Sequence, residues 1–311
     1  MSSSWPDIPY AAWRETCAAL HLYAQVLGKY RLARTPWLNH SWHATLYVTA
    51  SGLITSPVPD GPGAIDLALD LVDHAVVGRA SNGRSARFGL GPGTVADFHR
   101  RTLELVRFLG GTPELDPTPN EIPGAVPFPE DHASRPYDAG AVRRFFEALV
   151  QVDRVFKEFR TAFLGKATPV HLFWGSFDLA VTRFSGRTAP RHPGGVPGLP
   201  DAVTREAYSH EVSSAGFWPG GSGVESAAFY SYAYPSPEGF GKAKVRPAAA
   251  SFDAKLGEFL LPYDAVRKAP DPRSELMEFL RSTYEAAAEL GRWDRGGLEC
   301  ATGEPGRPRP I

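Results

Sequence analysis

The chain contains two similar segments, and this internal repetition constrains its fold more than any other feature. In the first segment, a helical pattern leads to Thr35-Pro36 and then to an extended stretch over residues 41–50. In the second, a helical pattern leads to Thr168-Pro169 and then to an extended stretch over residues 174–182. An offset that places Thr35 on Thr168 also superimposes the Leu-x-Val-Thr ends of the two stretches. We therefore predict a duplicated unit in which a helix precedes a sheet.

The bulk composition is that of a globular protein and argues against several function classes. The 311 residues are enough for a large hydrophobic core. A formal net charge of −1 argues against binding to nucleic acid or to an anionic membrane. No apolar run approaches the roughly 18 residues of a membrane span, and the first residues lack the pattern of a secretory signal. Cys17 and Cys300 alone form neither a disulfide framework nor a metal-binding cysteine cluster. We expect a cytoplasmic protein whose partner is a small molecule.

Hydrophobic periodicity predicts four long helices and a series of short strands. The helices are expected over residues 10–32, 94–109, 139–163 and 272–290. The strands are expected near residues 41–50, 52–57, 65–71, 76–81, 84–90, 170–184, 228–234, 247–252 and 258–262. Asn82-Gly83 lies between two of these strands and is typical of a type I′ hairpin turn.

These elements divide the chain into two halves and predict an α+β fold. The division gives a first half over residues 1–111, a Pro-rich connection over 112–138, a second half over 139–291 and a flexible tail over 292–311. The second half contains a long insertion, residues 186–223, without an obvious regular element. Because short turns link successive strands, we expect pseudo-duplicated antiparallel β-sheet regions with helices packed on one side, in one compact unit.

Strand alternation places polar and aromatic side chains on one face of each repeated stretch. This face carries Ser41, His43, Thr45, Tyr47 and Thr49 in the first copy and Trp174, Ser176, Asp178, Ala180 and Thr182 in the second. If both faces line a cleft between the halves, His43 and Asp178 would form an acid–base pair or share a metal ion. Tyr47, Trp174 and Ser176 would then contact the substrate. The alternative is a face that is solvated or whose hydrogen bonds are satisfied internally.

A divalent metal is the one cofactor that the sequence offers. His40 and His43 form an H-x-x-H pair, and His210 is a third candidate ligand. On a strand, residues three apart point to opposite faces, so a site that uses both needs a loop or bulge at Asn39–Ser41. The motifs of nucleotide-binding loops, α/β-hydrolases and zinc proteases are absent from the sequence.

The insertion contributes further candidate residues. Long loops inside a compact domain are commonly lids or binding loops. Within Ser209-His210-Glu211, we consider His210 and Glu211 as catalytic residues. Arg183 precedes the insertion and would hold an anionic group of the substrate. The alternative is that the arginines of this region tie the loop to acidic neighbours.

An aromatic row in the second half is a candidate for a binding surface. Tyr230, Tyr232 and Tyr234 alternate along one predicted strand and therefore share a face. Together with Trp218, Tyr230 and Tyr232 would line an aromatic pocket with hydrogen-bonding tips. The alternative is a core stripe whose hydroxyl groups are satisfied at the rim.

Three long runs carry a resemblance to a known family. They are TPWLNHSWHATLYVTASGL, VFKEFRTAFLGKATPVHLFWGSFDLAVTRFSGR and REAYSHEVSSAGFWPGG. These runs resemble a bacterial family known only as a domain of unknown function, over about residues 5–290. The resemblance implies a soluble bacterial protein and brings no activity to any residue.

The leading functional hypothesis is an enzyme that acts on a small polar or anionic molecule in a cleft between the halves. Two other classes stay open. One is a protein that binds or senses a small molecule without turnover. The other is a protein-interaction module with Trp218 as an exposed anchor. A concave cluster of His43, Asp178 and His210 would favour catalysis.

Overall fold

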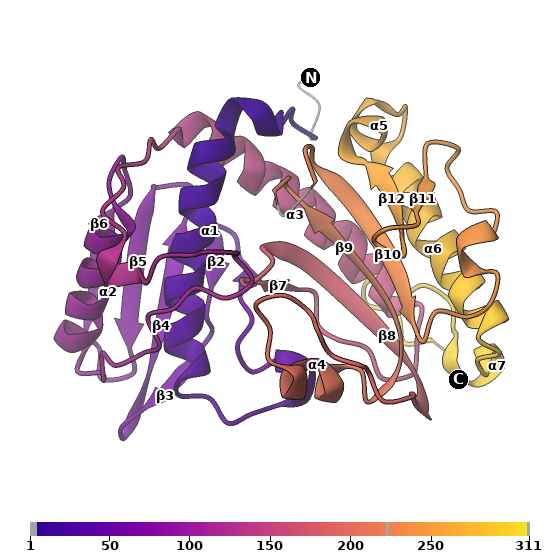
Figure 1. Cartoon of the computed structure of the whole chain (residues 1–311), viewed down its shortest axis with the longest axis horizontal. Helices are drawn as coiled ribbons and strands as arrows, with labels where there is room; N and C mark the ends of the chain where they lie inside the picture. Colours follow the sequence, from indigo (N-terminus) through magenta and orange to yellow (C-terminus); the bar gives the residue numbers. More distant parts are fainter. Residues whose placement is uncertain (1–4, 222–223, 310–311) are drawn as a thin grey trace.

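Two antiparallel sheets form the framework of the chain (Figure 1), which the computed structural model describes over residues 5–221 and 224–309. The first sheet has the order β1-β2-β4-β5-β6, and β3 pairs with β4 outside this path. Its strands are β1 Tyr47–Val48, β2 Gly52–Ile54, β3 Val58–Asp60, β4 Gly63–Asp70, β5 Ala75–Ala80 and β6 Ser85–Gly89.

The second sheet has the order β11-β12-β10-β9-β8-β7. Its strands are β7 His171–Phe173, β8 Asp178–Thr188, β9 His210–Trp218, β10 Ala228–Tyr234, β11 Ser251–Asp253 and β12 Glu258–Pro262. The two sheets meet where Leu46 and Leu172 exchange backbone hydrogen bonds of 3.0 and 2.8 Å.

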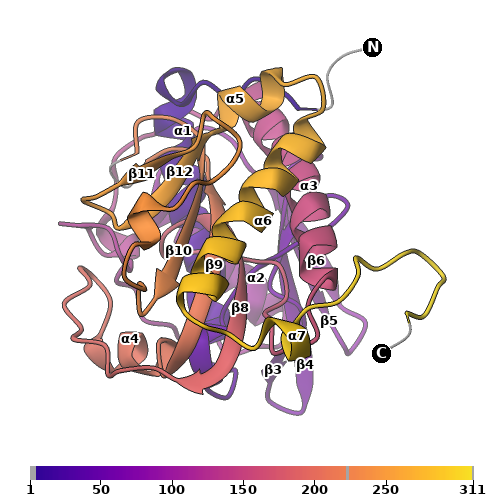
Figure 2. The same ribbon diagram turned by 90° about the vertical axis from the view of Figure 1, so that its right-hand side faces the viewer.

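Helices cover one face of the second sheet, as Figure 2 shows for α6 and α3. The helices are α1 Tyr10–Leu32, α2 Val95–Leu109, α3 Ala139–Thr161, α4 Asp201–Ala207, α5 Tyr263–Lys268, α6 Pro272–Leu290 and α7 Arg295–Leu298. Three 3₁₀ turns are η1 Asn39–Ser41, η2 Phe128–Glu130 and η3 Phe240–Lys242. In the first sheet, α2 packs against β5 and β6. The α+β fold with antiparallel sheets is confirmed.

Local sequence signals explain where the helices begin and end. The Thr94 side chain caps α2 by accepting a hydrogen bond from the amide of Asp97. Gly110 ends this helix with φ of 90°, a conformation that glycine adopts without a steric penalty. Asp138 and Asp271 cap α3 and α6 in the same way as Thr94 caps α2. No helix in the described ranges combines the length and the hydropathy needed to cross a bilayer.

The helix-covered face of the second sheet forms the centre of the core. Alternate residues of β8, β9 and β10 point to α3 and α6, and among them Val181, Phe217 and Phe229 are at most 1 % exposed. The rings of Phe217 and Phe229 lie 5.2 Å apart, and Phe229 also contacts Phe156 of α3. The opposite face of the same strands points away from α3 and α6.

The Asn82-Gly83 hairpin is confirmed, but its turn is not of type I′. That type needs positive φ at both central residues, and of these two only Gly83 has it, at 87°. The amide of Ala80 donates to the carbonyl of Arg84, and that of Gly83 donates to Ala80. The loop therefore has three residues rather than two, with Gly83 in the left-handed position.

The two repeated stretches are shorter as strands than predicted. Residues 39–44 form η1 and a turn, so the first strand begins only at Tyr47. Residues 174–177 form the tight turn between β7 and β8, where Phe177 has φ of 58°. The sequence offset therefore aligns β1, the first strand of one sheet, with β8, the second strand of the other. An internal duplication stays a prediction.

The insertion over residues 186–223 contains regular structure, contrary to the prediction. Its described part holds α4 and β9, and β9 pairs with both β8 and β10; residues 222–223 lie outside the described ranges. The run Ser213-Ser214-Ala215-Gly216 hides this strand because it lacks apolar alternation. In the predicted tail, α7 follows Trp293, and Leu298 accepts a backbone hydrogen bond of 2.7 Å from Leu164.

Candidate functional site

A cavity of about 570 Å³ lies on the face of the second sheet opposite α3 and α6. Its walls come from several segments of the chain. Lys29 and Leu32 come from α1, and Asp116, Asn120 and Glu121 come from the segment between α2 and α3. The remaining lining residues come from the second sheet, its β7–β8 turn, the segment over residues 37–45 that contains η1, and the segment around α4. The cavity therefore lies between the N-terminal and C-terminal parts of the chain.

Asp178 of β8 and Tyr230 of β10 line one side of the cavity, and Gly216 lies on β9 between these two strands. Tyr230 pairs with Gly216, which pairs in turn with Ala180. Gly216 leaves room for the Tyr230 ring, because a Cβ there would lie 2.3 Å from it. The Tyr230 hydroxyl thus reaches β8 and donates a 2.5 Å hydrogen bond to Oδ2 of Asp178. Ser176 donates a bond of the same length to Oδ1.

A row of aromatic rings continues along this side. The ring centroids of Trp218 and Tyr230 lie 4.3 Å apart, and those of Tyr230 and Tyr232 lie 6.1 Å apart. The hydroxyl of Tyr232 lies 2.9 Å from that of Tyr208. Burial raises the pKa of Tyr230 and Tyr232 well above the ordinary value of 10.0, so both stay protonated at neutral pH. The row offers ring faces and neutral phenol groups to a bound molecule.

Three carboxyl groups share the cavity with these rings. Asp178 is 3 % exposed, and its burial raises its pKa despite the hydrogen bonds that it accepts. Burial, followed by the charge of Asp178, raises the pKa of Glu121 to about 7. The same two causes and the nearby Asp253 raise the pKa of Glu258 to about 8. No lysine, arginine or histidine in the described ranges contributes to the pKa shift of any of the three.

Gln25 of α1 fixes the point where Glu121 enters the cavity. Its fully buried amide donates a 2.9 Å hydrogen bond to the carbonyl of Asn120 and accepts one of 2.7 Å from the Asn120 amide. Glu121 follows with its carboxyl group against Gly175, where a Cβ would lie 2.0 Å from Oε1. The backbone of Glu121 packs against Gly198, where a Cβ would lie 2.7 Å from its Cα. Two glycines from distant segments therefore make room for this one residue.

Trp174 and Lys29 form the wall nearest to α1. The Trp174 ring packs against Gly28, where a Cβ would lie 2.3 Å from it, and its Nε1 donates a 2.6 Å hydrogen bond to the carbonyl of Ala44. Lys29 is 4 % exposed and forms a 2.6 Å ion pair with Asp116. The charge of this lysine is therefore already balanced by its own partner.

Backbone strain is concentrated around the cavity. Three lining residues other than glycine have positive φ: His40 at 60°, Ser41 at 53° and Glu121 at 58°. Such conformations cost about 1–3 kcal/mol each and gather at functional sites. These strained conformations support a functional role for the cavity.

The mouth of the cavity exposes apolar side chains. Trp37 is 51 % exposed and Val196 is 37 % exposed, and both line the cavity. The Trp37 indole donates a hydrogen bond to Glu206 of α4. This contact links the α1–β1 loop to α4 across the mouth.

Many of the predicted site residues meet in this cavity. Its lining includes Asp178, Trp174, Ser176, Trp218, Tyr230, Tyr232 and His40. The predicted faces of β8 and β10 are thus the ones that line the cavity, even though Trp174 and Ser176 lie in a turn rather than on a strand.

His43 and Tyr47 do not line the cavity, and the structure does not bring His43 to Asp178. Nδ1 of His43 lies 3.2 Å from both the amide and the carbonyl of Leu38, and its ring packs on Trp37. The predicted pairing is wrong because His43 lies in the turn after η1. The ring of Tyr47 lies against the guanidinium of Arg31.

Arg183, His210 and Glu211 also lie outside the cavity lining. The Arg183 guanidinium points to the helix-covered face, 3.6 Å from the ring centroid of Phe159. It therefore does not hold an anionic group in the cavity. His210 contacts Ser209, and Glu211 forms a 2.6 Å ion pair with Arg187 at the start of β9.

The predicted metal ligands do not gather. Nδ1 of His40 lies 3.1 Å from the carbonyl of Ala207, and burial lowers the pKa of His40 to about 4. Between residues 5 and 221 and between 224 and 309, no three His, Cys, Asp or Glu side chains are arranged to hold a metal ion. The proposed set of His40, His43 and His210 is therefore not formed.

Glu121, Glu258 and Tyr208 line the cavity but are not among the predicted site residues. Glu258 has a readable signal, because it begins a predicted strand beside the one that carries Tyr230 and Tyr232. Tyr208 lies in the insertion that appeared to lack regular structure. Glu121 has no local signal, since its place depends on the contact of Asn120 with Gln25, 95 residues away.

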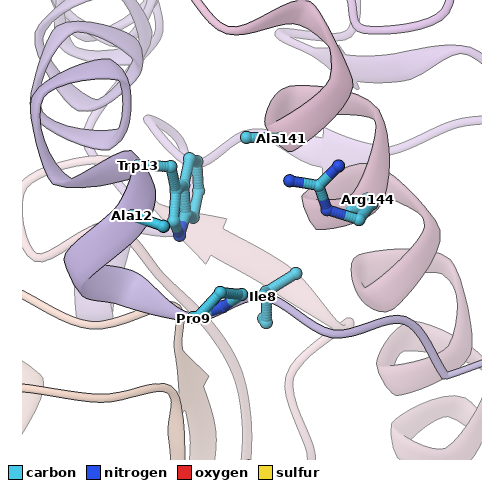
Figure 3. A pocket seen from close by; sticks show the side chains of 6 residues that line it. All are labelled: Ile8, Pro9, Ala12, Trp13, Ala141 and Arg144. Carbon is cyan, nitrogen blue, oxygen red and sulfur yellow. The ribbon is translucent and has the colours of Figure 1, made fainter.

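Two other hollows in the described part of the chain are less suited to a ligand. Figure 3 shows the smaller one, where Trp13 and Arg144 stand on opposite sides; at about 10 Å³ it has room for roughly one water molecule. The other, of about 660 Å³, lies beside α3 and the β1–β2 turn. Its charges are paired in ion pairs of Arg143 with Glu147 and of Lys157 with Asp153.

Comparison with known proteins yields one match. The model of a family of unknown function (DUF5996) matches residues 5–300. No curated protein and no solved structure matches the chain.

Proposed function

Since the chain belongs to the family of unknown function DUF5996, whose description supplies no activity, we propose a function from the cavity: an enzyme that acts on a small polar molecule by acid–base catalysis. The observation that carries this proposal is the set of carboxyl groups that share the cavity with phenol groups. Asp178 accepts hydrogen bonds from Ser176 and Tyr230, and Glu121 and Glu258 interact with it electrostatically. Perturbed carboxyl groups in a concave site are typical of catalytic acids and bases.

Glu121 is the carboxyl group best suited to carry a proton. A catalytic acid or base works best when its pKa lies near the working pH, and that of Glu121 is raised to about 7. In this scheme Glu121 takes a proton from the substrate or returns one to it. Asp178 is fixed by two hydrogen bonds and orients the substrate, while Tyr230, whose hydroxyl proton goes to Asp178, holds that carboxyl group in place.

An anionic substrate is the less favoured part of the original hypothesis. Asp178, Glu121 and Glu258 would repel a second negative charge, and Arg183 lies against Phe159 on the other face of the sheet. We therefore propose a substrate that is neutral or positively charged at the group nearest to Asp178.

The test is turnover of a mixture of bacterial metabolites, followed by mass spectrometry. The wild-type protein should deplete at least one compound and form a matching product. Glu121→Gln and Asp178→Asn should each lower the rate by at least about 100-fold. Glu104→Gln, on the exposed side of α2, should retain the full rate. Equal turnover by all four proteins would show that the carboxyl groups of the cavity carry no chemistry.

A protein that binds a small molecule without turnover is the second candidate. The aromatic row of Trp218, Tyr230 and Tyr232 favours it, because ring faces hold a ligand without any need for reaction. Native mass spectrometry of protein equilibrated with the same mixture distinguishes the two functions. Retention of an unchanged compound, with no product, would support binding alone. We also propose a reducing, cytoplasmic location, since Cys17 and Cys300 are both free thiols.

A further inference from the structure

We propose that the cavity takes a small organic cation, an amine or a quaternary ammonium that carries an apolar or aromatic part. This ligand class rests on the function proposed above and deepens it, since it states what the cavity recognises. The argument uses the balance of charge in the cavity, the ring faces beside it and the polar atoms that lack partners.

The balance of charge in the cavity favours a cationic ligand. Asp178, Glu121 and Glu258 have no cationic partner among the described residues. Lys29 is the cation of the α1 wall, and its charge is balanced by Asp116 at 2.6 Å. His40 is neutral, because burial lowers its pKa to about 4. A ligand that brings a positive charge would therefore stabilise the carboxylates that burial destabilises.

Ring faces next to Asp178 provide the second part of a cation site. Tyr230 contacts Asp178 through its hydroxyl and packs against Trp218 and Tyr232 through its ring. An ammonium group is attracted to the faces of tryptophan and tyrosine rings as well as to a carboxylate. Trp174, Phe173 and Trp37 extend the apolar surface of the cavity away from this point. A cation with an apolar or aromatic part matches both regions.

Among the described residues, four polar atoms of the lining lack a hydrogen-bond partner: Oδ1 of Asn120, Oγ1 of Thr204, Nε1 of Trp218 and Oε2 of Glu258. Thr204 is fully buried. Buried polar atoms are nearly always paired, so these atoms are suited to groups of a bound molecule. A protonated amine would donate to Glu258, a quaternary ammonium would attract its carboxylate by charge alone, and a polar substituent would pair with Thr204.

A metal ion fits the same charges less well than an organic cation. Metal sites need three or more ligand atoms that converge on one point, and no such group of His, Cys, Asp or Glu side chains occurs among the described residues. The carboxyl groups are instead distributed over the connection, β8 and β12. That spacing suits a ligand with several atoms and a diffuse charge.

Three probes with one indole ring and different charges test the proposal. Tryptamine is a cation, tryptophol is neutral and indole-3-acetate is an anion at pH 8. Calorimetric titration of the full chain should give a dissociation constant for tryptamine at least about tenfold below that for tryptophol. Indole-3-acetate should bind most weakly of the three. Tighter binding of tryptophol or indole-3-acetate would overturn the cation proposal while leaving the cavity as a binding site. No tryptamine binding up to about 10 mM would overturn it as well.

The pH dependence supplies an independent readout. Tryptamine should bind more tightly as pH rises from 6 to 8.5, because Glu121 and Glu258, with pKa values of about 7 and about 8, lose their protons in this range. The charge of Asp178 helps to raise both pKa values into this range, and that of Asp253 helps to raise the pKa of Glu258. Tryptophol should bind equally at both pH values. A tryptamine affinity that is constant or falls with pH would contradict the proposal.

Matched variants test whether tryptamine binds at the carboxyl groups of the cavity. Glu258→Gln should weaken tryptamine binding at pH 8.5 by about fivefold to tenfold and reduce its pH dependence. Glu104→Gln, outside the cavity, should change neither. If tryptamine binds and Glu258→Gln, Glu121→Gln and Asp178→Asn all keep full affinity, the cation is bound elsewhere and the proposal fails. Turnover of a neutral metabolite that depends on Glu121 would still support the proposed enzyme in that case.

Discussion

The two faces of the second sheet are built from the same strands and differ in almost every property. Along β10, Phe229 points to α3 and α6, whereas Tyr230 points to the cavity. Along β9, Phe217 is fully buried in the core, while its neighbour Gly216 makes room for a ring in the cavity. Alternation with a period of two allows this separation.

The difference is consistent with one face that stabilises the fold and another that serves the binding role proposed for the cavity. The helix-covered face is mostly apolar, with Arg183, Ser213 and Ser231 as polar residues, and its side chains fill the space between strands and helices. The cavity face holds Asp178 and Glu258, whose charged forms are destabilised by burial. Polar groups that reduce stability are retained where function needs them. Neighbouring residues on one strand should therefore respond differently to substitution.

The largest difference is expected between Phe229 and Tyr230. Phe229→Ala should lower the free energy of unfolding by about 3–5 kcal/mol, because it leaves a cavity in a packed core. Tyr230→Phe keeps the ring and removes one hydroxyl, so it should cost about 1 kcal/mol, mainly through the unpaired oxygen of Asp178. Urea denaturation of both variants measures the difference. Equal losses would show that the two faces do not have separate roles.

The second largest effect is expected at Gly216. In Gly216→Ala the new Cβ would lie 2.3 Å from the Tyr230 ring, so the ring must move away from Asp178. We expect a loss of about 1–3 kcal/mol in the free energy of unfolding. Gly89→Ala on β6 is the matched control, because its Cβ would contact nothing within 4 Å. A stability change of Gly216→Ala as small as that of the control would mean that Tyr230 does not need this gap.

The sequence predicts the helix-covered face better than the cavity face. Residues such as Phe156 in α3 and Phe229 in β10 follow the apolar period of their elements, so most helices and several strands were found near their true positions. β9 was missed because Ser214 and Gly216 face the cavity, where the hydrophobic pattern does not apply. Ser214 and Gly216 thus contribute to the cavity face and, for the same reason, make β9 difficult to predict from the hydrophobic pattern.

The cavity depends on contacts that no local pattern contains. His43 was assigned to a strand because the residues around it alternate, yet η1 and its turn place it against Leu38. Glu121 was overlooked because Gln25 and two glycines position it from distant segments. Asp178 was identified because it lies on the polar face of a long predicted strand. Local alternation therefore selects a face, while tertiary contacts decide which residues share a cavity.

A smaller effect on the free energy of unfolding, which appears as a dependence on pH, is expected for Glu258 on the cavity face. Its pKa is raised from 4.5 to about 8 in the folded chain, so the folded state binds more protons than the unfolded state between these values. Stability should therefore fall as pH rises through this window. Glu258→Gln removes this contribution and should be more stable relative to wild type at pH 9 than at pH 5, by about 1–2 kcal/mol after allowance for solvent screening. Denaturant midpoints at both pH values measure it. A difference that does not change with pH would show that Glu258 titrates normally.

The smallest effect is expected for Glu211, at the end of β9 farthest from Trp218. It contacts Arg187 and Ser185 near the surface, and Arg187 is 48 % exposed in its side chain. Glu211→Gln should therefore lower the free energy of unfolding by about 0.5 kcal/mol. Tryptamine binding should be unchanged, since Glu211 lies outside the cavity lining. Denaturation and calorimetry on one preparation test both statements. A loss of binding with intact stability would extend the functional surface of β9 beyond the cavity and return Glu211 to the site, as the sequence first suggested.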